Sequence, residues 1–280
     1  DMYGLGHNEK LIGRFLQTHK ADQAAGRIKV ATKFGIERQN GSYERRINNS
    51  PLYIRQACEN SLRRLGRECI DLYYVHRMDA ESDLAETVGV LSQLIHEGKI
   101  AHIGLCEVSA QTLALANQIY PITAVQSEYS LWSRGVENDI LPLCRELGIG
   151  FVAYSPLGRG FLSGKYVDPA KLDHNDFRRS NPRFQGDNLR HNLRLLDNLK
   201  AVAARHAGTP AQIALAWLLE KSENLVAIPG TSHIDRLEEN CAAAEIKLSP
   251  GDITLLEKTF FQEAVLGERY TAEGMKGVGA

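Results

Sequence analysis

A repeated alternation of short apolar runs with longer segments of helical periodicity constrains the fold of this chain most strongly. Between Pro51 and Gly66 the apolar residues recur at helical spacing, and Ser50 precedes a proline that suits the first turn of a helix. Short apolar strands that alternate with helices are typical of right-handed βαβ crossovers and a buried parallel sheet. We predict an α/β fold with strands at 27–33, 70–75, 101–105, 123–128, 150–154 and 225–228, and helices at 51–66, 84–97, 110–119, 139–147, 210–219 and from Ile234 onward.

No linker or break in composition divides the 280 residues, so we expect a single domain over residues 1–280. Hydrophobic residues make up 43% of the chain and charged residues 24%, which is enough apolar material for a sizeable core and excludes a disordered chain. The segment 167–192 is rich in turn-forming residues and exceeds the ~12–15 residues of most connections. We predict a mobile loop there rather than a regular element, and a surface tail in the Gly-rich, polar segment after Phe260.

Charge, hydropathy and cysteine content exclude several classes of function. The chain carries 33 Lys and Arg against 34 Asp and Glu, which argues against a nucleic-acid partner. Its longest apolar run, 213–219, is far shorter than the ~20 residues of a membrane-spanning helix. The first residues lack the basic and apolar parts of a signal peptide, so we expect a cytoplasmic protein. The five cysteines never show C-x-x-C spacing, which argues against a disulfide framework and a metal site. Nothing in the sequence indicates an oligomeric state.

Several predicted strands end in polar residues. In a parallel α/β barrel the chemistry lies at the carboxyl ends of the strands, where side chains from different strands converge. A single lysine or histidine there is most often structural, but the two together would help a nearby phenol to act as a proton donor, and Tyr3 is the candidate phenol. In chain order these strand-end residues are Lys33, His76, Cys106 with Glu107, Gln126, and Tyr154 with Ser155.

Motifs of fixed order and spacing run from residue 3 to residue 240. They are Tyr3-Gly4 with Asn8-Glu9, 31–35 (Ala-Thr-Lys-Phe-Gly), 71–76 (Asp-Leu-Tyr-Tyr-Val-His), 98–100 with 103–105, 125–130 (Val-Gln-Ser-Glu-Tyr-Ser), 154–160 (Tyr-Ser-Pro-Leu-Gly-Arg-Gly), and 228–231 (Ile-Pro-Gly-Thr) before Arg236 and Glu239-Asn240. This set resembles the aldo-keto reductase family. The segments 76–79, 128–132 and 181–184 are most similar to the branch that contains plant perakine reductase and auxin-induced reductases.

The resemblance implies a (β/α)8 barrel that binds NADP(H) without a Rossmann fold and reduces a small-molecule aldehyde or ketone. In that reaction Tyr3 donates a proton to the carbonyl oxygen, Lys33 is the cation that favours ionisation of the phenol, and His76 orients the carbonyl, while the nicotinamide supplies the hydride. The family's first two strands, and the aspartate of its Asp-Thr-Ala-x-x-Tyr-Gly motif, would lie before residue 1, and Asp1 occupies a variable position of that motif. We therefore expect the sequence to be N-terminally incomplete.

Further residues match family positions that hold NADP(H), and the loop 167–192 would cover the cofactor. Gln126 corresponds to a partner of the carboxamide and Tyr154 to the aromatic that stacks on the nicotinamide, while Cys106 and Glu107 stand where the family usually has Ser and Asn. The remaining positions are Ser155, Leu157, Gly160 and Lys165 around the pyrophosphate, Gly230, Thr231, Ser232 and Arg236 around the 2′-phosphate, and Glu239 and Asn240 at the adenine. Arg236 could instead form a surface ion pair with a neighbouring carboxylate.

The natural substrate is not encoded in these residues, although Trp132, Arg77 and Met78 are expected to line the mouth of its site. Two other functions stay open. The first is a cofactor-binding regulatory subunit that resembles the potassium-channel β subunits. The second is an unrelated barrel lyase that forms a Schiff base on Lys33.

Overall fold

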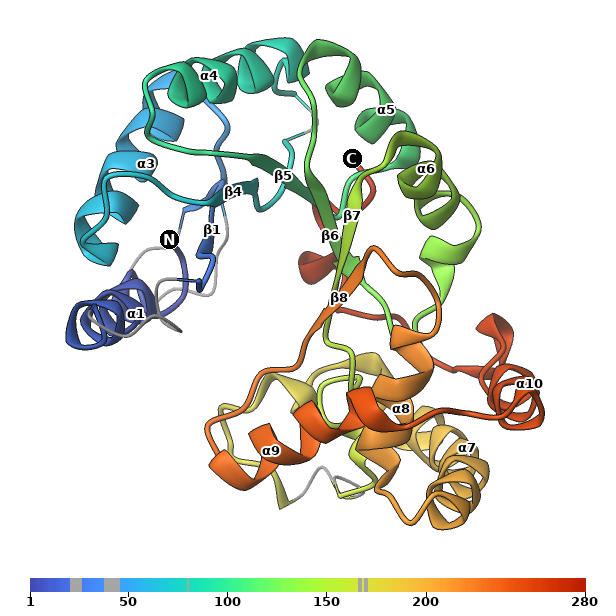
Figure 1. Ribbon diagram of the computed structural model, residues 1–280. Helices are drawn as coiled ribbons and strands as arrows, with labels where there is room; N and C mark the ends of the chain where they lie inside the picture. Colours follow the sequence, from blue (N-terminus) through green and yellow to red (C-terminus); the bar gives the residue numbers. More distant parts are fainter. Residues whose placement is uncertain (21–26, 38–45, 80, 166–167, 169–170) are drawn as a thin grey trace. The chain divides into compact units, whose positions relative to one another are not determined.

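A computed structural model describes residues 1–20, 27–37, 46–79, 81–165, 168 and 171–280 (Figure 1). They form two compact units, each described here by itself. The first contains the described residues of 1–126 with 146–149 and 277–280, and the second those of 127–145 with 150–276. Within the described part of the chain, no helix has the length and apolar character needed to span a membrane.

The first unit is built on parallel strands. Strands β1 (Ala31–Phe34), β4 (Leu72–Val75) and β5 (Ile103–Cys106) lie side by side in that order, and β5 pairs with the start of β6 (Ala124–Glu128). Strand β5 is buried over its whole length, whereas β1 alternates buried Thr32 and Phe34 with exposed Ala31 and half-buried Lys33. A short antiparallel ribbon, β2 (Ile36–Glu37) with β3 (Arg46–Ile47), follows β1.

The helices of the first unit are amphipathic, and two of the four begin with a side-chain cap, whereas neither Gly6 nor Ser50 makes such a bond before the other two. They are α1 (His7–Thr18), α3 (Pro51–Leu65), α4 (Leu84–His96) and α5 (Ala110–Ile119), and Figure 1 shows them in a row along the strands. Helix α3 ends where Gly66 adopts φ 65°, a left-handed conformation that costs glycine little. The side chains of Asp83 and Ser109 cap α4 and α5. The sequence signals that start and stop these helices are therefore local.

The second unit holds the end of β6, β7 (Gly150–Tyr154) and β8 (Leu225–Ile228), and β7 pairs with β8 in parallel. Its best-defined helix, α8 (Pro210–Leu219), begins with a capping box between Thr209 and Gln212 and is buried along almost its whole length. The other elements are α6 (Ile140–Leu147), α7 (Gly186–Arg205), α9 (Ile234–Ala242), α10 (Pro250–Thr259) and the 3-10 helices η1 (Gly135–Glu137), η2 (Phe161–Ser163), η4 (Phe177–Arg179), η5 (Pro182–Phe184), η6 (Ala243–Glu245), η7 (Gln262–Ala264) and η8 (Glu273–Met275).

The predicted α/β class with six parallel strands is confirmed, and α5, α8, β7 and β8 have the predicted bounds. The prediction of turn structure over 167–192 is wrong for its last part, because α7 begins at Gly186. Asn192, the last residue of the predicted loop, lies inside α7, and its fully buried side chain bonds across to Leu266. Residues 167 and 169–170 lie outside the described part, so the covering role of this loop stays a prediction. Helices α1 and α10 also lie outside the predicted elements.

The segment after Phe260 lies at the surface as predicted, since only Ala264 of residues 261–280 is buried, but specific polar bonds hold it in place. Leu266 donates its N–H to Asn192 Oδ1 (2.9 Å) and accepts from Asn192 Nδ2 (2.9 Å). Arg269 lies 3.8 Å from the carboxylate of Glu128, and in the first unit Gly279 donates to the carbonyl of Glu107 (2.7 Å). The segment is polar because its side chains and backbone make specific polar bonds within the two units.

Asp252 links α10 to the end of α7 and makes the stability of the second unit sensitive to acid. It accepts hydrogen bonds from Arg205, His206 and Ser249, and these bonds hold its pKa well below the usual range. A carboxyl whose pKa is depressed by folding stabilises the protein above its unfolded pKa and loses that effect as the pH falls toward the folded value.

We therefore expect Asp252→Asn to flatten the loss of stability below about pH 4, the range where an unperturbed aspartate protonates. Urea unfolding at a series of pH values measures this. Asp187→Asn, which removes an exposed pair with Arg190, is the control. An unchanged slope in Asp252→Asn would contradict the assignment.

Candidate active site

Three predicted catalytic side chains come together in the first unit. The ring of Tyr3 lies 5.7 Å from the ring of His76, measured between centroids, and Lys33 Nζ lies 5.2 Å from the centroid of the Tyr3 ring. Tyr3 is half exposed, whereas His76 is buried. A phenol that faces solvent beside a cation and an imidazole is suited to proton transfer to a small molecule.

The strand pairing explains how two of these side chains meet. Lys33 on β1 is in register with Tyr74 on β4, and the N–H of His76 continues the ladder by donating to the carbonyl of Phe34 (2.7 Å). Both residues thus lie at the carboxyl ends of adjacent parallel strands, where side chains converge. Tyr3 is in the turn that leads into α1.

Glu9 on α1 anchors that turn. This buried carboxylate accepts from Thr32 Oγ1 (2.6 Å) and from Arg64 Nε (2.5 Å), so it joins α1 to β1 next to Lys33 and to α3. Burial opposes ionisation of Glu9, but nearby positive charge and these hydrogen bonds outweigh it and lower its pKa. The ionised carboxylate of Glu9 therefore holds the start of α1, and with it the preceding turn that carries Tyr3, against β1 and α3.

The predicted carboxamide partners Cys106, Glu107 and Gln126 are all buried at adjacent strand ends, with Cys106 in register with Gln126. Gln126 hydrogen-bonds to Tyr74, whose ring passes over Gly104, where an added Cβ would come within 2.4 Å of it. Burial raises the pKa of the Cys106 thiol to about 12, so this residue is a neutral thiol rather than a nucleophile. Glu107 adopts φ 54°, and such non-glycine backbone occurs preferentially at functional sites.

Arg77 and Met78, predicted to line the substrate mouth, directly follow His76 and are buried in the first unit. Arg77 Nη1 donates to the carbonyl of His76 (2.8 Å). A Cβ on Gly277 would lie 3.2 Å from the carbonyl oxygen of Met78, so the last residues of the chain pack on this segment.

The second unit contains a cavity of about 690 Å³. It is lined by every cofactor position that was predicted within this unit, namely Tyr154, Ser155, Leu157, Gly160, Lys165, Gly230, Thr231, Ser232, Arg236, Glu239 and Asn240. A cavity of this size is typical of sites for organic cofactors. Sequence analysis missed Arg178 and His233, which also line it, because no motif marked either residue.

The cavity offers several features that suit an anion. Arg236 lies in the first turn of α9, where free N–H groups and the helix dipole favour negative charge. Lys165 is exposed, with Nζ 3.9 Å from Glu239 Oε2, and Thr209 Oγ1 donates to the other oxygen of Glu239 (2.6 Å). The residues present therefore fit a phosphate-bearing cofactor.

The turn 155–160 forms one wall of the cavity and has a strained backbone. Ser155 and Arg159 have φ of 49° and 58°, and Gly158 and Gly160 have φ of 56° and 90°. At Gly158 an added Cβ would come within 2.3 Å of Trp132 Nε1, so glycine is required there for space as well as conformation. Backbone of this kind persists only when its surroundings hold it.

Trp132, predicted at the substrate mouth, is only 1% exposed. Its indole stacks on Phe161 with centroids 4.1 Å apart and meets Phe184 edge-on at 5.6 Å. The structure thus places Trp132 in the aromatic core of the second unit, which favours a packing role.

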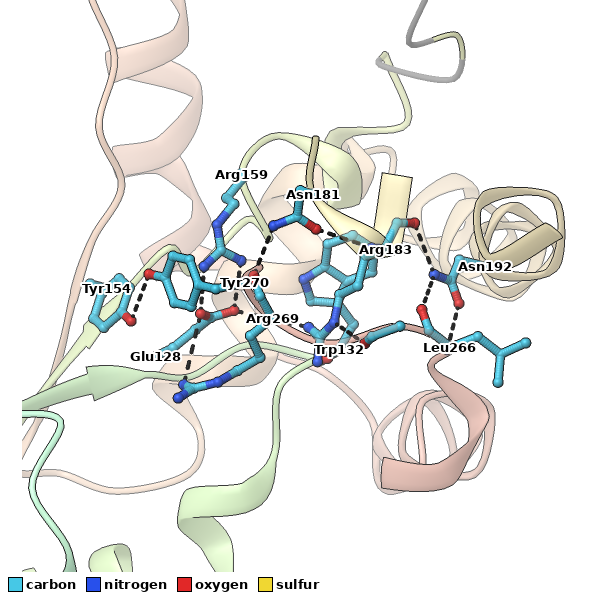
Figure 2. Close-up of polar contacts among 11 residues, drawn as sticks. Glu128, Trp132, Tyr154, Arg159, Asn181, Arg183, Asn192, Leu266, Arg269 and Tyr270 are labelled. Atoms are coloured by element: carbon cyan, nitrogen blue, oxygen red, sulfur yellow. Dashed lines mark hydrogen bonds and ion pairs between the residues drawn. The ribbon is translucent and has the colours of Figure 1, made fainter. Parts of the chain in front are cut away.

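Arg159 of the turn 155–160 belongs to a buried charge cluster around Glu128 (Figure 2). The carboxylate of Glu128 accepts two bonds from Arg159, at 2.9 and 2.6 Å, and lies 3.9 Å from Arg183 and 3.8 Å from Arg269. The ring of Tyr270 lies 4.5 Å from the guanidinium of Arg159, and its hydroxyl is 3.0 Å from that of Tyr154. Glu128 lies in the sequence motif 125–130, but nothing in the sequence indicates that it pairs with Arg159.

Comparison with known proteins identifies the family of this chain. The sequence pattern of the aldo/keto reductase family matches residues 1–259. A Glycine max protein named "Probable aldo-keto reductase 1" is 46% identical over 270 residues, which cover 96% of this chain and 76% of that protein.

Two solved structures are also similar. The glycerol dehydrogenase of Gluconobacter oxydans matches with a TM-score of 0.83 and 26% identity, over 92% of this chain and 78% of that one. A thermostable aldo-keto reductase in complex with the inhibitor epalrestat matches with a TM-score of 0.69 and 29% identity, over 92% and 79%. The fold is thus of the (β/α)8 type, with six parallel strands in the described residues. Sequence pattern, relatives and fold agree that this chain belongs to the aldo/keto reductase family of oxidoreductases.

Proposed function

We propose that this chain reduces an aldehyde or ketone to an alcohol with NADPH. The observation that carries the proposal is the convergence of Tyr3, Lys33 and His76 in the first unit. Membership of the aldo/keto reductase family supports a small carbonyl substrate and a nicotinamide cofactor. The cofactor, when bound, supplies the hydride.

The protein's own residues handle the proton and the orientation of the substrate. The half-exposed hydroxyl of Tyr3 donates a proton to the carbonyl oxygen. The ammonium of Lys33 stabilises the phenolate that remains, and His76 donates a hydrogen bond that orients the carbonyl. Cys106, Glu107 and Gln126 hold the carboxamide end of the cofactor.

The cavity of the second unit is proposed to bind NADPH. Tyr154 would stack on the nicotinamide. The turn with Ser155, Leu157 and Gly160 and the side chain of Lys165 would hold the pyrophosphate, and the start of α9 would hold the 2′-phosphate. The guanidinium of Arg236 matches a phosphate with two parallel N–H groups. The segments 76–79, 128–132 and 181–184 favour placement in the branch of plant perakine and auxin-induced reductases.

Oxidation of NADPH in the presence of 4-nitrobenzaldehyde, followed by absorbance, tests the proposal. Turnover that consumes one NADPH per alcohol formed supports a carbonyl reductase. Tight binding of NADPH without turnover of any aldehyde or ketone in a broad panel would contradict the proposal and favour a regulatory subunit. Trapping of a substrate adduct on Lys33 by borohydride would contradict it in favour of a lyase.

Replacement of Arg236 by alanine is expected to raise the Kd for NADPH about 10- to 100-fold, since it removes charge-assisted bonds to the phosphate. The Kd for NADH, which lacks this phosphate, should change less than about threefold. Fluorescence titration measures both constants. Arg190→Ala, an exposed arginine on α7, is the control. Equal weakening of both cofactors by Arg236→Ala would mean that the 2′-phosphate binds elsewhere.

A further inference from the structure

We propose that Glu128 is a positioning residue for the cofactor cavity, which acts through Arg159 and Tyr270 and is not itself part of the cavity lining. This inference rests on the proposed function, because it assigns a task in cofactor binding. On this inference, the segment 266–270, which carries Arg269 and Tyr270, helps to hold the cavity wall in place. Three contacts lead outward from Glu128 (Figure 2).

The first contact fixes the strained turn. Arg159 is held at φ 58°, a conformation that a non-glycine residue adopts only when its environment requires it. Its guanidinium is almost fully buried and forms a two-pronged bond to a carboxylate that is 0% exposed. Such a bond sets orientation as well as distance. Glu128 therefore holds Arg159, and with it the backbone that runs from Ser155 to Gly160 along the cavity wall.

The second contact reaches the aromatic that lines the cavity. The ring of Tyr270 packs over the guanidinium of Arg159, at 4.5 Å from its centroid. The hydroxyl of the same residue lies 3.0 Å from the hydroxyl of Tyr154. An ordered Arg159 thus orders Tyr270, and Tyr270 restricts the ring of Tyr154 at the proposed nicotinamide position.

The third contact ties down the segment that carries Tyr270. Arg269 pairs with Glu128 at 3.8 Å, and its carbonyl accepts a bond from Asn181 (2.8 Å). Arg183 Nε donates to the carbonyl of Gly267 (3.1 Å). The side-chain amide of Asn192 bonds both the N–H and the carbonyl of Leu266. Because three arginines surround one carboxylate, loss of its charge leaves their guanidinium groups repelling one another in a buried place.

The second unit also provides a matched control. Glu137 accepts two bonds from Arg134, at 2.9 and 2.7 Å, and one from the hydroxyl of Tyr129 (2.7 Å). This group has the same Glu, Arg and Tyr chemistry and is partly buried, but none of the three residues lines the cavity. A general effect of losing an ion pair would therefore act on both sites, whereas a positioning effect would act on one.

The test compares Glu128→Gln with Glu137→Gln in the full chain. We expect Glu128→Gln to raise the Kd for NADPH, and its KM, about tenfold, and to leave kcat at saturating NADPH within about twofold. Glu137→Gln should leave the Kd within about twofold. In the protein without cofactor, hydrogen exchange of the amides in 155–160 and 266–270 should speed up only in Glu128→Gln. Equal changes in both variants would overturn the inference.

Tyr270→Phe provides a milder variant that removes only the hydroxyl of a partly exposed side chain. We expect a rise in Kd of about two- to fivefold with unchanged thermal stability. Unchanged affinity in both Tyr270→Phe and Glu128→Gln, with unchanged amide exchange, would overturn the inference while wild-type turnover left the proposed function intact. If the wild-type chain does not bind NADPH, the proposed function fails, and the exchange measurement still decides whether Glu128 positions the turn.

Discussion

Tyr3→Phe is expected to lower kcat for carbonyl reduction by about 10²- to 10⁴-fold, the range that a positioned general acid contributes. The substitution keeps the ring that lies against His76 and Lys33 and removes only the hydroxyl. Because no cavity is created and the side chain is half exposed, folding should be unaffected. The loss should therefore fall on the rate of the chemical step.

Steady-state rates with 4-nitrobenzaldehyde at saturating NADPH measure this effect, and fluorescence titration gives the Kd for NADPH, which should stay within about twofold of wild type. Tyr120→Phe, at the end of α5 in the same unit, is the control and should keep full activity. If Tyr3→Phe weakened NADPH binding as much as it lowered the rate, the hydroxyl would be a binding group rather than the proton donor.

Trp132→Ala is expected to destabilise the protein by about 3–5 kcal/mol, the usual cost of truncating a buried tryptophan. The indole stacks on Phe161 and packs beside Gly158, so its removal opens a void behind the strained turn of the cavity wall. Trp132→Phe keeps part of the stacked ring and should cost less. A residue that only lined a substrate mouth would tolerate either change with little loss of stability.

Urea unfolding of the two Trp132 variants gives the free energies of unfolding. Phe261→Ala, which truncates an aromatic side chain that is half exposed, is the control and should change the free energy by less than about 1 kcal/mol. If Trp132→Ala unfolded like the wild type but had a raised KM for bulky aldehydes, the predicted place at the substrate mouth would be restored.

The elements that sequence predicts well are those whose signals are local. Helix α8 has Thr209, a first-turn proline and Gln212 in one short stretch, and the structure forms the capping box that these residues allow. The ends of β7 follow from an apolar run with a glycine before it and a turn motif after it. Most residues that line the cavity of the second unit were also predictable, because they belong to recognisable motifs, whereas Arg178 and His233 were not.

The elements that sequence misses depend on distant partners. Asn192 has high turn propensity, yet it lies inside α7 because its amide bonds to Arg183 and to Leu266, which is 74 residues away. The role of Glu128 requires Arg159 and Tyr270, which come from separate parts of the chain. No local pattern encodes such a meeting, since tertiary packing overrides propensity at these positions.

The cavity of the second unit is drawn almost entirely from two continuous stretches, 154–165 and 228–240, with Ala211 and Arg178 added from elsewhere. Each stretch begins at the last residue of a strand, Tyr154 of β7 or Ile228 of β8, and runs through the connection that follows it. On the proposed function, substitutions that retune the choice between NADPH and NADH can therefore accumulate in two short windows while the paired strands stay unchanged.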